Sequence, residues 1–107
     1  MPLYIVTYEH PDEDGWRRHV LPHVAWLRDR VNDGSLLASG PFTSAPVKGA
    51  LLIMDAPDRP ALDALIATDP FAAENLIENM VVREWDPIFG AFNACSSMPE
   101  RHQSGEE

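Results

Sequence analysis

The sequence predicts an α+β domain in which helices cover one face of a single antiparallel sheet. Four short stretches are rich in β-branched, aromatic and other apolar residues, which is typical of strands. Two further stretches repeat apolar residues at helical spacing. Their order along the chain is β-α-β-β-α-β. This order predicts a ferredoxin-like fold with a four-stranded antiparallel sheet.

The predicted strands occupy residues 2–9, 35–42, 49–56 and 80–86. The first and the third are apolar on both of their alternating faces. Helices of this fold cover only one sheet face, and a monomer rarely exposes an apolar patch as large as the other face would leave. We therefore expect a homodimer in which a second copy lays its sheet against the first.

The first helix is predicted from one apolar stripe and from Pro22 and Gly34, which mark its expected start and end. Four residues recur at i, i+4, i+7 and i+11: Val20, Val24, Leu27 and Val31. Proline is tolerated in the first turn of a helix, so we expect the regular helix to begin near Pro22. Residues 16–21 would then be an irregular lead-in and residues 10–15 a loop. Gly34 is placed for a left-handed C-terminal cap.

The second helical region is predicted to be divided by a proline. Asp58 is a natural N-cap for a helix that runs to about Thr68. The residue before a proline is disfavoured in the α region, so Asp69 lies at a break before Pro70. A short helix over residues 71–78 is expected to follow.

Composition and length narrow the expected number of domains, the classes of partner and the location of the protein. The chain has 107 residues and a net charge of −9, which fits one domain and argues against binding of nucleic acids or anionic membranes. We expect residues 1–95 to form the domain and residues 96–107 to be a disordered tail. There is no apolar run of the roughly 18 residues that span a bilayer, and we expect no signal peptide, because the N-terminus leads directly into a strand without a basic region. The lone Cys95 fits a reducing compartment, so a cytoplasmic location is expected.

His23 and Asp69 are the candidate catalytic residues. A carboxylate that accepts from one imidazole nitrogen fixes the tautomer and leaves the other nitrogen free to take or give a proton. Both helices pack on one sheet face, so we expect a His23 nitrogen about 2.6–3.2 Å from an Asp69 oxygen, or one water away. The alternative is that His23 is only a border residue of its helix and Asp69 only an N-cap.

Ser39, Gly40 and Pro41, at the end of the second strand, are candidate substrate-binding residues. The Ser39 hydroxyl could orient a substrate, although no nucleophile elbow surrounds it, and a small residue needed for packing is the alternative. Tyr8 and Phe71 are further candidates for a pocket wall, against the alternatives of strand propensity and an anchor for the short helix.

No metal or organic cofactor is expected. His19 and His23 have the i, i+4 spacing of zinc ligands on a helix, but no third ligand is marked. The sequence also lacks phosphate-binding and dinucleotide-binding loops.

The stretches PHVAWLRDRVNDGSLLASGPF and DPFAAENLIENMVVREWDPIFG, together with residues 2–9 and GALLIMDA, resemble the YciI-like (YCII-related) family. The resemblance implies a dimeric α+β barrel of ferredoxin-like subunits. It also implies an active site built on a histidine and an aspartate, which His23 and Asp69 match. The family is similar in fold to muconolactone isomerase, and one branch acts as a dehydrochlorinase on hydroxylated chloroaromatics.

Three hypotheses of function follow. The first is a cofactor-independent enzyme in which His23, oriented by Asp69, catalyses elimination, dehydrochlorination or isomerisation of a small aromatic or lactone-like molecule. The second is a non-catalytic module of the same fold that binds a metabolite or another protein. The third is a cofactor-free monooxygenase.

Overall fold

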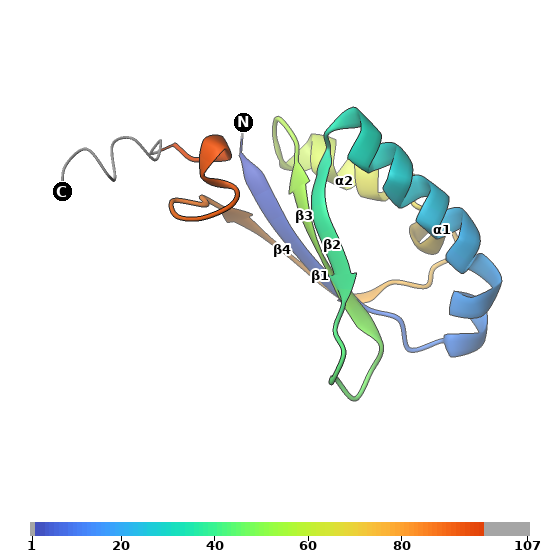
Figure 1. Cartoon of the computed structure of the whole chain (residues 1–107). Helices are drawn as coiled ribbons and strands as arrows, with labels where there is room; N and C mark the ends of the chain where they lie inside the picture. Colours follow the sequence, from blue (N-terminus) through green and yellow to red (C-terminus); the bar gives the residue numbers. More distant parts are fainter. Residues whose placement is uncertain (1, 98–107) are drawn as a thin grey trace.

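The computed structural model of the protein describes residues 2–97 (Figure 1). The strands are β1 (Leu3–Glu9), β2 (Leu36–Pro41), β3 (Gly49–Asp55) and β4 (Glu78–Trp85). The helices are α1 (Glu13–Asp33), α2 (Arg59–Ile66), α3 (Pro70–Ala73) and the 3₁₀ helix η1 (Asn93–Cys95). The strands form one antiparallel sheet in the order β2-β3-β1-β4, and α1 and α2 lie on the same face of it. This is the predicted ferredoxin-like βαββαβ arrangement, with its second helix divided.

Helix α1 begins at Glu13, well before Pro22, so the predicted irregular lead-in over residues 16–21 is wrong and the predicted loop over residues 10–15 is confirmed only for residues 10–12. Its true N-cap is Asp12, whose side chain accepts a hydrogen bond from the Gly15 N–H at 3.0 Å. Pro22 lies on the exposed side of the helix, where the backbone carbonyl that it leaves unpaired can bond to water. The C-terminus is as predicted, because Gly34 adopts a left-handed φ of 86°.

The division between α2 and α3 follows the predicted break at Asp69. Asp58 caps α2 by accepting from the Ala61 N–H at 2.9 Å. Helix α3 ends at Ala73 rather than near residue 78. Asn75 takes a positive φ of 60°, which ends the helical path and lets β4 begin at residue 78, earlier than predicted.

The hydrophobic core lies between the sheet and the helices. The alternation of β1 directs Tyr4, Val6 and Tyr8 into it, and the opposite strand face carries the partly exposed Ile5 and Thr7. The other buried core members come from α1, β2, β3 and α2 and include Trp26, Leu36, Leu52, Met54, Leu62 and Ile66.

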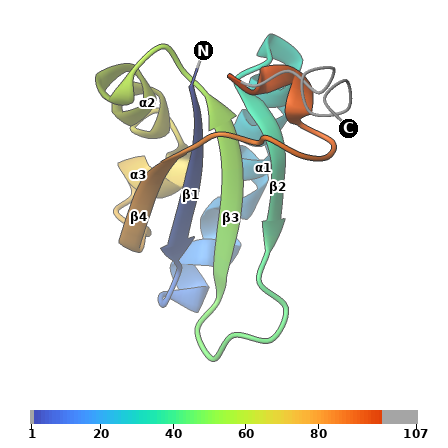
Figure 2. The same ribbon diagram turned by 90° about the vertical axis from the view of Figure 1, so that its left-hand side faces the viewer.

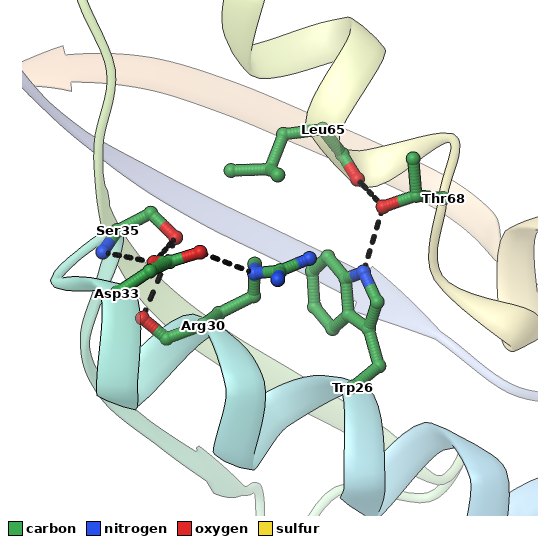
Figure 3. Close-up of polar contacts among 6 residues, drawn as sticks. All are labelled: Trp26, Arg30, Asp33, Ser35, Leu65 and Thr68. Atoms are coloured by element: carbon green, nitrogen blue, oxygen red, sulfur yellow. Dashed lines mark hydrogen bonds and ion pairs between the residues drawn. The ribbon is translucent and has the colours of Figure 1, made fainter.

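Polar contacts join α1 to the end of α2 (Figure 3). The Trp26 indole N–H donates to the Thr68 hydroxyl at 2.7 Å, and that hydroxyl donates to the Leu65 carbonyl at 2.6 Å. Nearer the end of α1, Arg30 donates to Asp33 at 2.9 Å and its guanidinium lies 5.7 Å from the Trp26 ring. These contacts fix the C-terminal half of α1 against its neighbours.

The second face of the sheet is largely open. After β4 the chain crosses one end of this face (Figure 2), where the Phe92 ring meets Trp85 at 6.4 Å. Asp86 accepts hydrogen bonds from Ser96 and Ser97, so the described part of the predicted tail contacts the domain. The rest of that prediction, residues 98–107, lies outside the described residues. Within residues 2–97, no helix is long and apolar enough to cross a membrane.

Gly49 is expected to be essential for close pairing of β1 with β3. A Cβ added at Gly49 would lie 2.6 Å from the backbone oxygen of Tyr8, so Gly49→Ala must displace a central strand. We expect it to lower the free energy of unfolding by about 1–3 kcal/mol in urea denaturation. Gly40→Ala is the matched control, because a Cβ there meets no atom within 4 Å. Equal effects of the two substitutions would contradict this account.

Candidate functional site

His23 of α1 and Asp69, the N-cap of α3, meet in the interior. The His23 Nδ1 lies 2.8 Å from Oδ1 of Asp69 and 3.0 Å from Oδ2. The two residues are 7% and 1% exposed. The two side chains therefore lie at the separation that the sequence predicts.

Both members of this pair are held by Phe71. Its backbone N–H donates to Oδ1 of Asp69 at 3.0 Å, which fixes the carboxylate as the cap of α3. Its ring stacks on the His23 imidazole, with centroids 3.9 Å apart and planes 13° from parallel. The orientation of the imidazole is thus set by a hydrogen bond at one edge and an aromatic ring on one side.

The second nitrogen of His23 is free for chemistry. Since Asp69 acts as the acceptor, the proton of a neutral His23 lies on Nδ1 and the lone pair on Nε2. Among residues 2–97, Nε2 has no hydrogen-bond partner, and it is not one of the fully buried unpaired polar atoms. His23 itself lines a cavity.

That cavity has a volume of about 570 Å³ and lies between α1 and the strands β2 and β3. It brings together most of the residues singled out from sequence. Those that line it are His23, Ser39, Gly40, Pro41 and Phe71. Asp69 lies behind His23, and Tyr8 is buried beside His10 and does not line the cavity.

The apolar stripe of α1 lines the cavity, and of its four residues Leu27 also packs against the hydrophobic core. Val20, Val24 and Leu27 are half-buried and Val31 is 57% exposed, and all four border the cavity. The buried residues of α1 are Gly15, His23 and Trp26, on an adjacent face. The stripe that predicts the helix is therefore the wall of a cavity.

His10 is the residue at the site that the sequence analysis missed. It is 3% exposed, borders the cavity, and lies between the Tyr8 ring at 4.8 Å and the Phe71 ring at 4.9 Å. Its Nδ1 is buried without a hydrogen-bond partner among the described residues. Residues 8 and 10 share one side of an extended chain, so continuing the alternation of β1 by one step would have found it.

Burial shifts the acidity of both residues beside His23. Desolvation, followed by the nearby His23, lowers the pKa of His10. Desolvation raises the pKa of the Tyr8 phenol, and the charge of Asp69 adds to that effect. At neutral pH His10 is thus a neutral imidazole and Tyr8 a neutral phenol.

His19 and His23 contact two different acidic residues. His19 lies 3.7 Å from Glu74, and His23 is bonded to Asp69. Within the described part of the chain, no cluster of three or more His, Cys, Asp or Glu residues could hold a metal ion.

The lowered pKa of His10 predicts a loss of stability in acid. As the pH falls below about 6.5, the unfolded chain binds a proton on His10 that the folded chain resists, so the free energy of unfolding decreases. Above that pH both states are neutral and the contribution is constant. We expect His10→Phe to make urea denaturation less pH-dependent between pH 7 and 5.

His10→Asn serves as a second variant, because it also removes the titration but keeps a polar side chain. In both variants the free energy of unfolding should depend less on pH than in the wild type, whatever the stability of each variant at pH 7. If the wild-type dependence persisted in both, His10 would not be its source.

Comparisons with solved structures identify the fold. The structure resembles the 5-chloro-2-hydroxyhydroquinone dehydrochlorinase of Burkholderia phenoliruptrix AC1100, which was solved in complex with 2,5-dihydroxybenzoquinone. The TM-score is 0.67 at 19% sequence identity, and the match covers 78% of this chain and 93% of that one. It also resembles an antibiotic biosynthesis monooxygenase, with a TM-score of 0.51, 18% identity and coverage of 78% and 96%. The protein Rv0793 of Mycobacterium tuberculosis gives a TM-score of 0.53, 15% identity and coverage of 85% and 99%. At these identities the likeness establishes a shared fold.

No curated protein sequence matches the chain significantly. The model of the YCII-related domain, however, matches residues 1–86 and so covers all four strands up to Trp85. The chain therefore belongs to the YCII-related family.

Proposed function

We propose that the protein is a small, cofactor-independent enzyme in which His23, oriented by Asp69, transfers a proton during elimination or isomerisation. The observation that carries this proposal is the buried hydrogen bond from His23 Nδ1 to Asp69, which leaves Nε2 unpaired at a cavity wall. A histidine with one nitrogen fixed by a carboxylate is a general acid/base suited to neutral pH.

The chemistry needs only the residues at the cavity. Nε2 takes a proton from a substrate carbon or hydroxyl, and Asp69 stabilises the imidazolium that forms. In an elimination, the electron pair released forms a double bond as a leaving group such as chloride departs. In an isomerisation, the same proton returns to a different substrate atom. Ser39 borders the cavity, and in this proposal its hydroxyl donates a hydrogen bond to a substrate oxygen.

The size and the lining of the cavity support a small aromatic or lactone-like substrate. A volume of about 570 Å³ lies in the range usual for small-molecule sites. The apolar stripe of α1 and the Phe71 ring suit the body of such a molecule. The structurally similar dehydrochlorinase acts on a chlorinated hydroxyhydroquinone, which makes hydroxylated chloroaromatics a reasonable first set to test.

The first test replaces His23. With a substrate found by screening chloroaromatics for chloride release and lactones for absorbance changes, we expect His23→Gln to lower kcat by about 10²–10⁴-fold, the usual contribution of general acid–base catalysis. His19→Gln is the control, since His19 lies on the same helix and does not line the cavity. Circular dichroism should show both variants folded.

Full activity of His23→Gln would exclude the proposal. Ligand binding without product formation in the wild type would favour a binding module.

The second test separates the charge of Asp69 from its cap. In Asp69→Asn the amide oxygen can still accept from the Phe71 N–H, so the start of α3 is retained. The loss of the carboxylate removes the stabilisation of the imidazolium, and we expect kcat to fall by a factor of about 10² or more. Asp69→Ala should in addition lower the free energy of unfolding by about 0.5–2 kcal/mol, because it removes the cap. Unchanged kcat in Asp69→Asn would contradict the role given to the carboxylate.

We further propose that a second copy of the chain covers the open sheet face. Apolar side chains point to this face and are only partly buried or exposed: Ile5, Leu51, Ile53 and Val81. Their burial against a second sheet would remove a patch that monomers seldom expose.

A charge on this face should separate the two copies. We expect Ile5→Lys to shift the protein from dimer to monomer in size-exclusion chromatography with light scattering, because burying an unpaired ammonium is costly. Leu21→Lys is the control, since Leu21 is 78% exposed on α1, which lies on the other side of the sheet. A wild-type protein that is monomeric at micromolar concentration would refute the proposed dimer.

A further inference from the structure

We infer that the molecule bound in the cavity is an apolar acid, whose carboxylate is held by Lys48 at the cavity rim. The inference deepens the proposed function, because it names the substrate class of the same cavity and places one end of the molecule.

The charged side chains that line the cavity are positive. Among residues 2–97, the ionised side chains that line it are those of Arg28 and Lys48, and no aspartate or glutamate borders it. This is unexpected in a chain with 17 acidic and 8 basic residues. The buried carboxylate of Asp69 lies behind His23 and is hydrogen-bonded to its imidazole, so Arg28 and Lys48 are the charges that a ligand in the cavity meets directly.

Both cations lack a counter-charge. Arg17, Arg30 and Arg59 form ion pairs with neighbouring acids. Within residues 2–97, neither Arg28 nor Lys48 forms an ion pair or a side-chain hydrogen bond with another residue. An anion in the cavity would supply the missing partner.

Lys48 is the better placed of the two. Its ammonium lies 4.4 Å from the centroid of the Trp16 ring, a cation–π contact that holds the charge at the cavity without occupying its hydrogen-bond donors. Its carbonyl accepts from the His10 N–H at 2.7 Å, and the His10 ring lies 6.5 Å from the His23 ring. Because Lys48 and His23 line the same cavity, a small molecule whose carboxylate binds Lys48 can place its apolar part beside His23.

Most of the remaining wall is apolar, apart from Ser39 and the imidazoles of His10 and His23. Val20, Val24 and Leu27 border the cavity from α1, and Phe71 borders it below His23 in the stack. Neutral His10 adds no charge to this region. An acid with a flat or compact apolar body matches both parts of the lining.

The test compares benzoate with benzamide, which has nearly the same shape and no charge. We expect benzoate to bind about tenfold more tightly to the wild-type protein by isothermal titration calorimetry, the equivalent of about 1.4 kcal/mol. Lys48→Gln should remove this preference, and Lys48→Arg should retain most of it. Arg18→Gln is the matched control, because it removes the same charge from an exposed residue outside the cavity.

Equal binding of the two probes, no binding of benzoate, or an equal loss in Arg18→Gln would overturn the inference. The result is independent of turnover, so it can be distinguished from failure of the proposed function. If His23→Gln retained full activity while the benzoate preference depended on Lys48, the enzyme mechanism would fail and the class of ligand would stand.

Discussion

The carboxylate of Asp69 is the group on which the site depends. A carboxylate that is 1% exposed is strongly unfavourable unless its oxygens are paired. Here Oδ1 accepts from both the His23 ring and the Phe71 backbone, and Oδ2 also lies within hydrogen-bond distance of the ring. One side chain thus starts α3, holds α3 against α1 and fixes the imidazole. Loss of the His23 ring would leave the buried carboxylate with the Phe71 N–H as its remaining described donor.

Much of this arrangement is encoded locally and could be predicted. Pro70 forces the break that puts Asp69 at a helix start, and Gly34 ends α1 where the sequence indicates. Two helices packed on one sheet face bring their borders together, so the contact between His23 and Asp69 follows from element order and two short motifs. The antiparallel sheet follows from the same order.

Other features depend on contacts that a local pattern does not record. Pro22 looks like a helix start, yet the Asp12 cap upstream and an exposed position for the proline allow a longer α1. The alternation of β1 places His10 on the same side as Tyr8, but that pattern does not record its contact with Phe71, which is distant in sequence. Lys48 gains its position from Trp16, which is distant in sequence.

The two faces of α1 divide structure from function. Trp26 and the Thr68 hydroxyl secure the helix to α2 through a polar contact, and caps at Asp12 and Gly34 satisfy its ends. Because these contacts fix α1 from another side, the stripe from Val20 to Val31 need not pack into the core to hold the helix in place. A ligand that covers this stripe removes apolar surface from water, so binding and stability are coupled through the same side chains. The anchoring of the helix from its other side therefore leaves an apolar wall on the cavity beside His23.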